Sequence, residues 1–473
     1  MAESGKLNIS GNIRLFDSLT RRECEFDVQR NKLVKIYVCG LTVYDRAHIG
    51  HAKSIVFFDV LRRVMKAKGF EVTFVQNFTD VDDKIIDRAS NLGIKAEELA
   101  QRYIDEYYKD FDQLNVARGD KMPRATENVG EMIMMIDGLL KKEYAYVVKS
   151  GVYMDVTKVR DYGKLSRIKV GELKTGARVE PDPYKKNQLD FALWKFSDSP
   201  PAWDSPWGRG RPGWHIECSA MIHKYLQEPI DIHGGGEDLL FPHHENEIAQ
   251  SESLFEKPLS RVWMHVGMVK LEGVKMSKSL GNIVSVRDFM DRFGPNLLRF
   301  FVLSTHYRKQ LDYNEQMLEK AIENWRLVEL AEAVVRNYPA LGSKEDDAEA
   351  EISMKDFDDH ISSDMNTALA LSDLLKISKL VNSAFTKGDF DYGKETLLSS
   401  SFSTAFSILG FKSAELPEEE REQVELLLNE RKNMREAGKF KEADKIRERL
   451  NEMKIAVVDH KKGTLWYKSE IIG

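Results

Sequence analysis

The order of hydrophobic and polar residues near the N-terminus predicts a strand, a helix and a second strand. Residues 34–38 and 72–78 are short, β-branched and aromatic runs, as strands usually are. Between them, residues 54–69 carry apolar side chains at helical spacing, and Gly69 ends the pattern. This order predicts an α/β fold with a doubly wound parallel sheet that has helices on both faces.

Further along the chain the pattern changes several times. Residues 96–145 predict a long helical region, whereas residues 122–207 break into short alternating pieces that we interpret as an insertion between two halves of the sheet. Residues 231–236 predict a strand that runs into a glycine turn. The remainder predicts a helical segment (316–411), an amphipathic helical pair (424–453) and a small hairpin (457–466).

Length and composition are typical of a multidomain globular protein. A chain of 473 residues is too long for one core, so we expect about two to four domains. No apolar run approaches the ~18 residues that a membrane span needs, and we expect no signal peptide and no membrane partner. Three cysteines, Cys24, Cys39 and Cys218, are too few for a disulfide framework, which favours reduced thiols and a cytoplasmic protein.

Charge is distributed unevenly along the chain. The net charge of −6 argues against a general nucleic-acid binder. Residues 341–420 hold 7 Lys and Arg against 17 Asp and Glu, whereas residues 421–473 hold 13 against 10. A solvated helical face explains most such shifts, so the basic tail indicates no partner by itself.

The segment His48-Ile49-Gly50-His51 predicts phosphate binding at the start of a helix. The preceding strand ends at Gly40 and a helix begins near Ile49, where unpaired N–H groups and the positive end of the helix dipole suit a phosphate. Gly50 lets a nucleotide approach the backbone, and the two histidines can donate hydrogen bonds to a phosphate in its pentacovalent state. Taken alone, two unrelated histidines at a helix start would be the simpler interpretation.

A second motif, Lys275-Met276-Ser277-Lys278-Ser279, offers compact positive charge on a loop. Lys275 and Lys278 can neutralise the β- and γ-phosphates of ATP as pyrophosphate leaves. An ordinary basic surface loop would explain this string alone. Together and in this order, the two motifs predict a site that holds ATP phosphates from two sides and forms an adenylate.

Dispersed Cys, His and Glu residues form a possible metal site. Two thiolates, from Cys39 and Cys218, with one imidazole and one carboxylate are a sound set of zinc ligands. His243 and Glu247 stand at i, i+4 and share a helix face, which favours His243 over His244 without excluding the latter. Two buried cysteines beside polar helix residues explain the same spacing equally well.

Residues 231–236 are predicted to start as a strand and to end in a run of three glycines. The sequence His233-Gly234-Gly235-Gly236-Glu237-Asp238 is similar to a turn that cradles a nucleotide, with Asp238 placed for a ribose hydroxyl. An ordinary turn at the end of a strand is the simpler alternative.

Longer segments around these motifs resemble the cysteinyl-tRNA synthetase family of class I. They are YVCGLTVYDRAHIGHAKS (37–54), QNFTDVDDKII (76–86), SPWGRGRPGWHIECSAM (205–221), DIHGGGEDLLFPHHENEIAQS (231–251) and STHYRKQLDY (304–313). The similarity extends from about residue 10 to the end of the chain and includes residues 451–466. One departure is Leu41, where the family usually has proline, and it should slightly loosen the turn before the first helix.

The resemblance implies a Rossmann-type catalytic domain with an inserted connective domain, then an α-helical domain and a small domain that recognises the anticodon. The expected limits are the first half of the catalytic domain at 1–121, the connective domain at 122–207, the second half of the catalytic domain at 208–255, a linking domain with the lysine loop at 256–315, the helical domain at 316–411 and the anticodon-recognition domain at 412–473.

The resemblance also implies the chemistry. The family joins L-cysteine and ATP-Mg²⁺ into cysteinyl-adenylate and pyrophosphate, and then transfers cysteine to the 3′-terminal adenosine of tRNA(Cys). Zinc binds thiolate far better than hydroxyl, which lets such an enzyme reject serine without an editing site. The residues that match the zinc ligands of the family are Cys39, Cys218, His243 and Glu247, and those that match its amino-acid pocket are Thr79, Trp214 and His233.

Candidate contacts for the other two substrates complete the expected site. For ATP they are Gly40, His48, Gly50, His51, Gly236, Asp238, Lys275 and Lys278, of which His48, His51, Lys275 and Lys278 are the candidate catalytic residues. For tRNA they are Arg431, Lys432, Arg435, Lys439 and Lys441 in the basic tail, with Trp466 to stack on an anticodon base. The resemblance also favours a monomer.

Three other functions fit parts of the sequence. A ligase that adenylates cysteine but passes it to an amino-sugar amine, as mycothiol-type ligases do, would lack the tRNA-recognition tail. A zinc-dependent RNA-binding protein without catalysis would not need the histidine and lysine motifs. A small nucleotidyltransferase would need neither 473 residues nor the Cys, His and Glu set.

Overall fold

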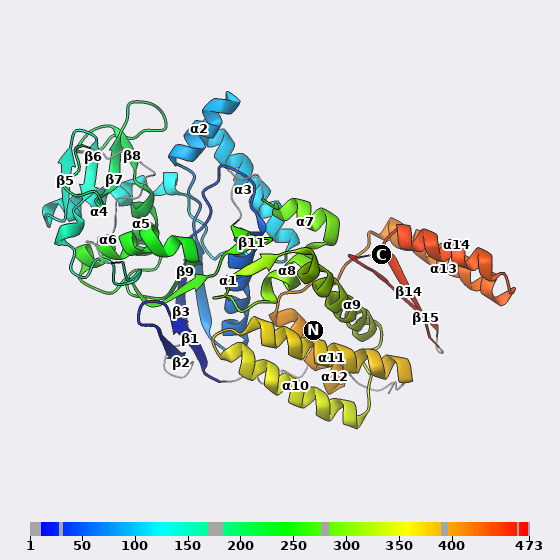
Figure 1. Cartoon of the computed structure of the whole chain (residues 1–473). Coiled ribbons are helices and arrows are strands. Elements are labelled where there is room, and N and C mark those ends of the chain that lie inside the picture. The colour runs from blue at the N-terminus through cyan, green and yellow to red at the C-terminus, as the bar shows by residue number, and fades with distance from the viewer. Residues whose placement is uncertain are drawn as a thin grey trace.

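The computed structural model describes residues 11–27, 32–168, 183–275, 283–388, 396–460 and 463–471. Its central sheet has four parallel strands in the order β10-β9-β3-β4 (Figure 1). Their bounds are β3 (Leu33–Val38), β4 (Glu71–Gln76), β9 (Ile230–Gly236) and β10 (Ser260–Val266). The expected β-α-β unit is confirmed, because α1 (Ile49–Ala67) connects β3 to the parallel strand β4.

Helices cover both faces of this sheet, as the alternation of side chains in a strand requires. Ile36 and Val38 belong to the core that α1 fills, whereas Tyr37 between them joins a second core with residues of α5 (Trp214–Tyr225) and α6 (Glu245–Phe255). The first strands of the two halves, β3 and β9, lie side by side. The crevice at their carboxyl ends is therefore where a doubly wound sheet binds its ligands.

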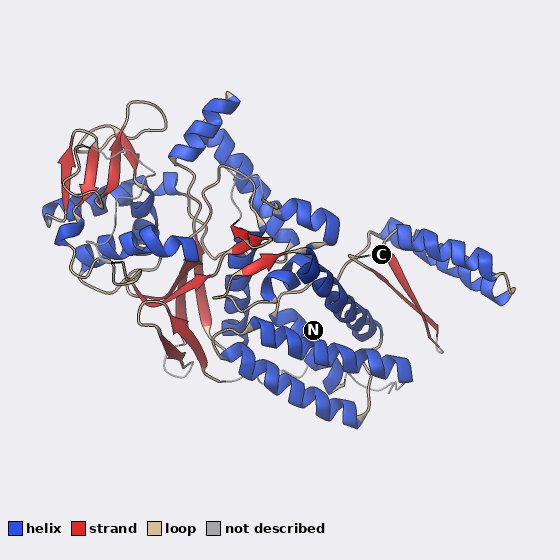
Figure 2. Cartoon of the chain, viewed as in Figure 1, coloured by secondary structure: helices blue, strands red, loops and turns tan. Residues whose placement is uncertain are grey.

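The segment between the two halves contains helices and a separate antiparallel sheet. The expected helical region at 96–145 is interrupted, since α3 (Ala96–Gln113) ends before Asn115, whose φ is 54°, and α4 (Val129–Lys141) begins only after Pro123. The sheet has the order β5-β6-β7-β8 and packs on α4 (Figure 2). The bounds are α2 (Asp83–Leu92), β5 (Ala145–Val148), β6 (Gly151–Met154), β7 (Phe191–Phe196) and β8 (Gly210–Pro212).

Two of the expected domain limits do not match the strand pairing. The strand β8 pairs with β7, so the sheet of the insertion continues past residue 207 to Pro212. The parallel sheet includes β10, so the second half of the sheet continues past residue 255, where we expected a linking domain. Strand pairing over long distances decides both limits, and local sequence patterns do not record it. The other limits stay predictions.

The predicted glycine turn at residues 234–236 is wrong. These glycines are the last residues of β9 and pair with Met264, His265 and Val266 of β10. A Cβ atom on Gly234 would lie 2.1 Å from the ring of Phe58 in α1, so glycine is required here by the close approach of a helix. The chain turns only afterwards, at residues 237–239.

After the sheet, the chain forms a small three-stranded sheet and two short helices. A strand β11 (Val269–Leu271) pairs with β12 (Val274–Lys275) and with β13 (Leu311–Tyr313). Between β12 and β13 come α7 (Val286–Phe293) and α8 (Pro295–Leu303), and α8 packs against α1. An N-terminal hairpin of β1 (Ile13–Asp17) and β2 (Arg22–Phe26) lies beside β10.

The last third of the chain is mainly helical, as expected. Helices α9 (Glu315–Asn337), α10 (Lys344–Ser362), α11 (Thr367–Lys387) and α12 (Leu397–Ile408) pack together and against α1 and α8. The expected helical pair and hairpin are confirmed as α13 (Glu418–Glu436), α14 (Phe440–Glu452), β14 (Ile455–His460) and β15 (Gly463–Lys468). The pair α13 and α14 projects away from the rest of the molecule (Figure 1).

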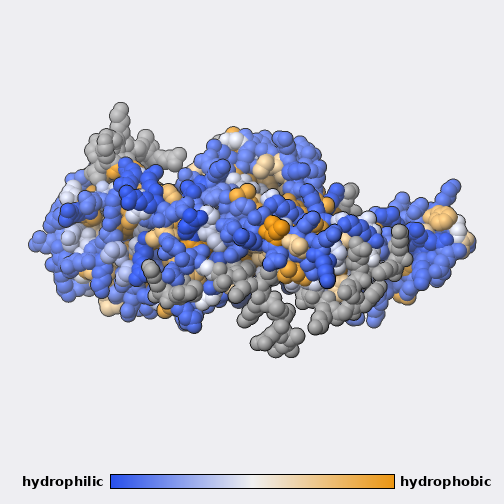
Figure 3. Space-filling view, turned by 90° about the horizontal axis from the view of Figure 1, so that it is seen from below, coloured by the Kyte–Doolittle hydropathy of each residue, from blue (hydrophilic) through white to orange (hydrophobic). Residues whose placement is uncertain are grey.

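The surface is mostly hydrophilic where Figure 3 shows it, with small hydrophobic groups that are scattered over it. Among the residues that the structure describes, none of the helices combines the length and apolar character needed to cross a bilayer.

Candidate functional site

Four side chains from distant segments meet at the carboxyl end of β3. Cys39 follows that strand, Cys218 belongs to α5, and His243 and Glu247 come from the residues that lead into α6 and from its first turn. The Sγ atoms of Cys39 and Cys218 are 3.7 Å apart, Cys39 Sγ is 3.4 Å from Glu247 Oε1, and His243 Nε2 is 3.0 Å from the same oxygen. The sequence-predicted ligands are therefore brought together.

The spacing of these donor atoms fits a tetrahedral ion. Bonds of about 2.3 Å to sulfur and about 2.0 Å to oxygen would place two sulfurs about 3.8 Å apart, and a sulfur and an oxygen about 3.5 Å apart. The distances of 3.7 Å and 3.4 Å agree with both values. Two thiols, an imidazole and a carboxylate, all buried, are a donor set that suits zinc.

Burial and mutual charge set the protonation of this group. Burial raises the pKa of Cys39, and the neighbouring Cys218 and Glu247 raise it further. Burial also acts to raise the pKa of Cys218, but its contacts with Cys39 and His243 outweigh this and bring the value to about 6. The pKa of Glu247 falls well below its usual range despite burial, because His233 and His243 lie beside it. One thiol and the carboxylate are thus ready to bind a cation.

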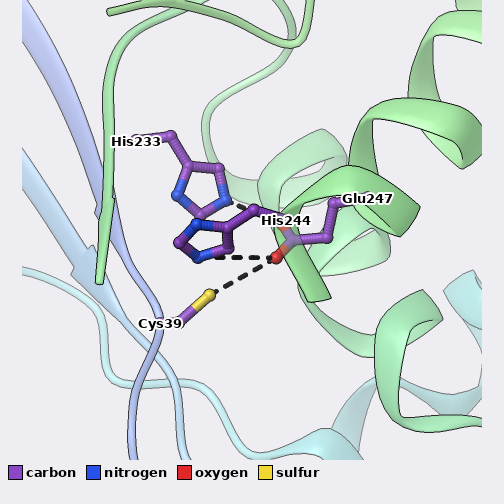
Figure 4. Close-up of side chains that lie close together, drawn as sticks. All are labelled: Cys39, His233, His244 and Glu247. Atoms are coloured by element: carbon purple, nitrogen blue, oxygen red, sulfur yellow. Dashed lines mark hydrogen bonds and ion pairs between the residues drawn. The ribbon is translucent and has the colours of Figure 1, made fainter. Parts of the chain in front are cut away.

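A second set of donors shares Cys39 and Glu247 with the first. Figure 4 shows the rings of His233 and His244 pointing toward Glu247, and all four donor atoms lie within 4.8 Å of one another. His233 Nε2 is 2.7 Å from Glu247 Oε2, while His244 Nε2 is 4.0 Å from Oε1. Both histidines that the sequence left open therefore face the site, and His243 is the nearer of the two to Glu247 Oε1.

The residues expected to close an amino-acid pocket surround this group. Thr79 Oγ1 donates a hydrogen bond to Glu217 Oε2 at 2.8 Å, and Glu217 precedes Cys218. The ring of Trp214 lies with its centroid 4.4 Å from that of His243. His233 contacts the candidate ligand Glu247 directly. Trp214 contacts the ligand His243, and Thr79 reaches the cluster through Glu217, the neighbour of Cys218 in the sequence.

His48 and His51 form a reciprocal cap at the start of α1. The backbone N–H of His51 donates to Nδ1 of His48 at 3.3 Å, and the N–H of His48 donates to Nδ1 of His51 at 3.2 Å. The rings are stacked with their centroids 3.6 Å apart. Because each Nδ1 accepts a hydrogen bond, each neutral ring carries its proton on Nε2, so both can act as Nε2–H donors.

The segment after the lysine motif is joined to the start of α1. Backbone hydrogen bonds join the segments on either side: Ile49 donates to Val284 O at 3.1 Å and Val286 donates to Ala47 O at 2.9 Å. Residues 284–286, which follow the lysine motif in the sequence, thus lie beside the histidine motif. Of Lys275 the structure describes the backbone, as the last residue of β12, and Lys278 lies outside the described residues.

Gly40, Gly50 and Asp238 line the same end of the sheet. A Cβ atom on Gly40 would lie 1.5 Å from the carbonyl oxygen of Asn77, so glycine is required by the approach of two chain segments. Gly50 lies in the first turn of α1. Asp238 is exposed, just after β9, and its Oδ1 would lie 2.5 Å from a Cβ atom on Gly236.

Comparison with known proteins gives the same family. A family described as the class I (C) catalytic domain of tRNA synthetases matches residues 25–323, and the cysteinyl-tRNA ligase anticodon-binding domain matches residues 418–466. A cysteine–tRNA ligase of Carboxydothermus hydrogenoformans is 44% identical over 96% of this chain and 99% of its own length. One of Pyrococcus horikoshii is also 44% identical, over 97% of this chain and 100% of its own.

The chain belongs to the cysteinyl-tRNA synthetase family.

Solved structures of other synthetases share the fold. A methionyl-tRNA synthetase of Mycobacterium tuberculosis in complex with methionyl-adenylate has a TM-score of 0.56 at 15% identity, with 80% of this chain and 89% of that one covered. A leucyl-tRNA synthetase complex of Agrobacterium radiobacter K84 has a TM-score of 0.57 at 11% identity, with 80% and 83% covered. At these identities the likeness supports the class I fold alone.

In the anticodon-binding domain of this synthetase, the structure does not support Arg431 as a tRNA contact. Arg431 is 3% exposed, and both terminal nitrogens of its guanidinium donate to Asp459, at 2.8 Å and 2.6 Å. It therefore joins α13 to the hairpin and is not available as a phosphate contact. Arg435 shares Asp459 but is exposed, Lys432 is exposed, and Trp466 is half-buried against the core of this domain.

Sequence reasoning missed a chain of buried imidazoles in this synthetase. His244 Nδ1 lies 2.8 Å from Nε2 of His265, whose Nδ1 lies 2.9 Å from Ser18 Oγ. On the other side of the cluster, His215 Nδ1 is 3.1 Å from Nδ1 of His243. The doubled histidine at 243–244 was the local signal, but His265 stands in an apolar strand and only the pairing of β10 with β9 brings it here.

Proposed function

We propose that this synthetase joins L-cysteine to ATP as cysteinyl-adenylate, releases pyrophosphate, and transfers cysteine to the 3′-terminal adenosine of tRNA(Cys). The observation that supports it most is the junction at the end of β3. There Cys39, one member of a donor set suited to a thiolate-binding metal, lies nine residues before His48 in the sequence, on the same strand-to-helix connection. Amino-acid selection and phosphate handling would then share one structural element.

Selection of cysteine is assigned to a zinc ion held by Cys39, Cys218, His243 and Glu247. When bound, zinc supplies a soft Lewis acid that favours a thiolate over a hydroxyl. The lowered pKa values of Cys218 and Glu247 keep these two ligands anionic at neutral pH. Thr79, Trp214 and His233 enclose the cysteine and exclude water from it.

Phosphate chemistry is assigned to the histidine and lysine motifs. The cysteine carboxylate attacks the α-phosphate of ATP-Mg²⁺, and the Nε2–H groups of His48 and His51 donate to the phosphate oxygens as negative charge moves. Lys275 and Lys278 neutralise the departing pyrophosphate, while Gly40, Gly50, Gly236 and Asp238 receive the nucleotide. No side-chain nucleophile is needed, since positioning and electrostatics lower the barrier.

A cysteine ligase that acts on an amino-sugar amine is the nearest alternative. Residues 418–466 match an anticodon-binding domain, which such a ligase would not need. We also propose, from the family, that the protein is cytoplasmic and acts as a monomer.

The test is cysteine-dependent exchange of pyrophosphate into ATP, followed by transfer to tRNA. Exchange with cysteine but not with serine, and cysteine attached to tRNA(Cys), is the expected result. Exchange without transfer to tRNA, but with transfer to an amino sugar, would favour the alternative.

A variant locates the chemistry at the histidine motif. His51→Ala removes one Nε2–H donor and should slow exchange about 10²- to 10³-fold. It also removes a helix cap, which should cost about 1 kcal/mol of stability. Asp346→Ala removes the corresponding N3 side chain from the reciprocal cap of α10 and serves as the matched control. Equal slowing by both variants would mean that the cap and not the donor matters.

A further inference from the structure

The anticodon-binding domain is attached to the rest of the protein by two short connections. We call residues 418–468, from α13 to β15, the C-terminal module; residues 411–417 lead into it and residues 469–471 leave it. The module has its own small core, formed by Val424, Leu427, Leu450, Ile455 and Val457. Its two helices project away from the body (Figure 1), so the two connections, together with the packing of β15 on the main core, set its orientation.

One side chain at the start of α8 holds both connections. Nδ2 of Asn296 donates to the carbonyl oxygen of Lys412 at 2.8 Å, and Oδ1 of Asn296 accepts from the N–H of Lys412 at 3.1 Å. The same Nδ2 donates to Glu470 Oε1, also at 2.8 Å. Asn296 is 7% exposed, so these bonds are shielded from water.

Glu470 caps α8 from the far end of the chain. The residue before the helix, Gly294, has no side chain to cap it, and Pro295 has no N–H. The N–H groups of Asn296 and Leu297 donate to Glu470 Oε2 at 3.1 Å and 3.2 Å. A Cβ atom on Gly294 would lie 2.5 Å from the same oxygen, so glycine makes room for this carboxyl group.

Helix α9 holds the same two connections a second time. Glu329 accepts hydrogen bonds from Ser469 Oγ at 2.6 Å and from the N–H of Glu470 at 2.7 Å. One turn further on, Glu332 accepts from Ser413 Oγ at 2.5 Å. Each connection is therefore held by both α8 and α9.

The start of α8 is also linked to the phosphate site. Helix α7 directly precedes α8, and the segment before α7 pairs with residues 47–49 at the histidine motif. Helix α8 packs along α1, whose first residues carry that motif. The attachment point of the module is thus fixed relative to the site of adenylate formation.

We propose that Asn296 and Glu470 are positioning residues that set the distance between the C-terminal module and the catalytic crevice. An RNA that touches both places must match this distance, because two linked contacts reinforce each other only when the geometry lets both form. The proposal rests on the proposed function for its partner, a structured RNA that reaches from the module to the crevice. Neither residue belongs to the candidate ATP, cysteine, zinc or tRNA contacts.

The first test measures the distance itself. A donor and an acceptor dye, attached through noncanonical residues at the exposed positions Lys445 in α14 and Lys355 in α10, report the position of the module. Asn296→Ala and Glu470→Ala should broaden the distribution of transfer efficiencies in the free protein. A distribution that is unchanged in both variants would overturn the proposal. The dye measurement does not require the protein to be active.

The second test separates positioning from catalysis. Both variants should raise KM for tRNA about tenfold and leave cysteine-dependent pyrophosphate exchange within about twofold of the original protein. Glu470→Gln keeps the shape and one acceptor oxygen, so it should recover most of the loss. The double variant should cost less than the sum of the two single ones, because both act at one junction.

Glu420→Gln is the matched control. It also removes a carboxylate, but from an exposed pair with Lys468 within the module, so it should leave both readouts unchanged. Parallel loss of exchange and of transfer in the Asn296 and Glu470 variants would overturn the proposal. An absence of tRNA transfer in the original protein would instead count against the proposed function, while the dye measurement would still decide the role of the junction.

Discussion

Cys39 has two roles in the site: its backbone links two strands, and its side chain is a candidate metal ligand. Its N–H donates to Gly234 O at 3.0 Å, which ties the end of β3 to β9, and its thiol faces Cys218 and Glu247. The next residue must be glycine because Asn77 lies so close. A backbone fixed on both sides holds the thiol in place before any ligand arrives, which lowers the entropy cost of binding.

Cys218→Ser tests the metal assignment at this scale. A hydroxyl is a much poorer zinc ligand than a thiolate, so the variant should lose its zinc, as elemental analysis after dialysis would measure. Cys24→Ser changes an exposed cysteine outside the cluster and should keep about one zinc per chain. Full zinc content in the Cys218 variant would refute the assignment of this residue.

Helix α8 illustrates how an element depends on residues far from it in sequence. Its own flanking residues, Gly294 and Pro295, supply neither a capping side chain nor a first N–H. The cap comes from Glu470, 174 residues after Asn296, whose N–H it accepts. Burial raises the pKa of Glu470 to about 8, and the neighbouring Glu329, whose pKa is also raised by burial, adds to the effect.

These raised pKa values predict a dependence of docking on pH. Because the pKa of Glu470 is higher in the folded protein than its unperturbed 4.5, the stability it contributes is fully present below about pH 4.5 and is lost as pH rises through about 8. Glu329 acts in the same direction. The connection at residues 411–417 should therefore be cut faster by a protease at pH 9 than at pH 6.

Glu470→Gln checks the origin of this dependence. Its amide stays neutral at every pH, so the increase in cutting between pH 6 and pH 9 should be smaller than in the original protein. The rate of cutting in the connection is divided by the rate at a site in a loop outside the C-terminal module. This ratio removes the effect of pH on the protease itself. An equal increase in both proteins would contradict the role of Glu470.

At the scale of the whole molecule, the C-terminal module has a small core of its own, but part of it also packs on the main core of the protein. Val424, Leu427 and Ile455 form its own core, whereas Leu465 and Tyr467 of β15 belong to the main core of the protein. The ring of His460 at the end of β14 also lies 4.7 Å from that of Phe385 in α11. Removing the module together with its connections (residues 412–473) therefore takes away packing and a helix cap as well as the expected tRNA contacts.

Deletion of residues 412–473 should separate the two reactions at a cost in stability. Cysteine-dependent pyrophosphate exchange should persist, because the candidate ligands and the histidine motif lie outside the deleted part. The KM for tRNA should rise strongly, and the midpoint of thermal unfolding should fall, since α8 loses the carboxyl group that caps it.

Charge reversal at Lys432 and Lys439 provides the control for this deletion. Both side chains are exposed in the module, so the fold should be kept while the KM for tRNA rises with a weaker dependence on salt. Equal loss of exchange and of tRNA transfer on deletion would contradict the division of labour between the two parts.

Local order was largely determined by the sequence itself. The strand, helix and strand from 33 to 76, the start of α1 near Ile49 and the final helical pair with its hairpin all follow from periodicity within about 20 residues. The motif residues His48 and His51 could be placed on a helix start for the same reason. The candidate ligands could be named from their residue types, but only the family resemblance favoured a metal site over buried cysteines, because their spacing from 39 to 247 carries no local period.

Tertiary structure decided what depends on long-range pairing. The strand order β10-β9-β3-β4 brings Cys39 to Cys218 and Glu247, moves the domain limits, and turns the expected glycine turn into strand. Asp459 takes Arg431 out of the expected tRNA surface, and Glu470 becomes the cap of a distant helix. Each result depends on which distant segments lie side by side in the fold. A local pattern of residues does not show which distant segment it will contact.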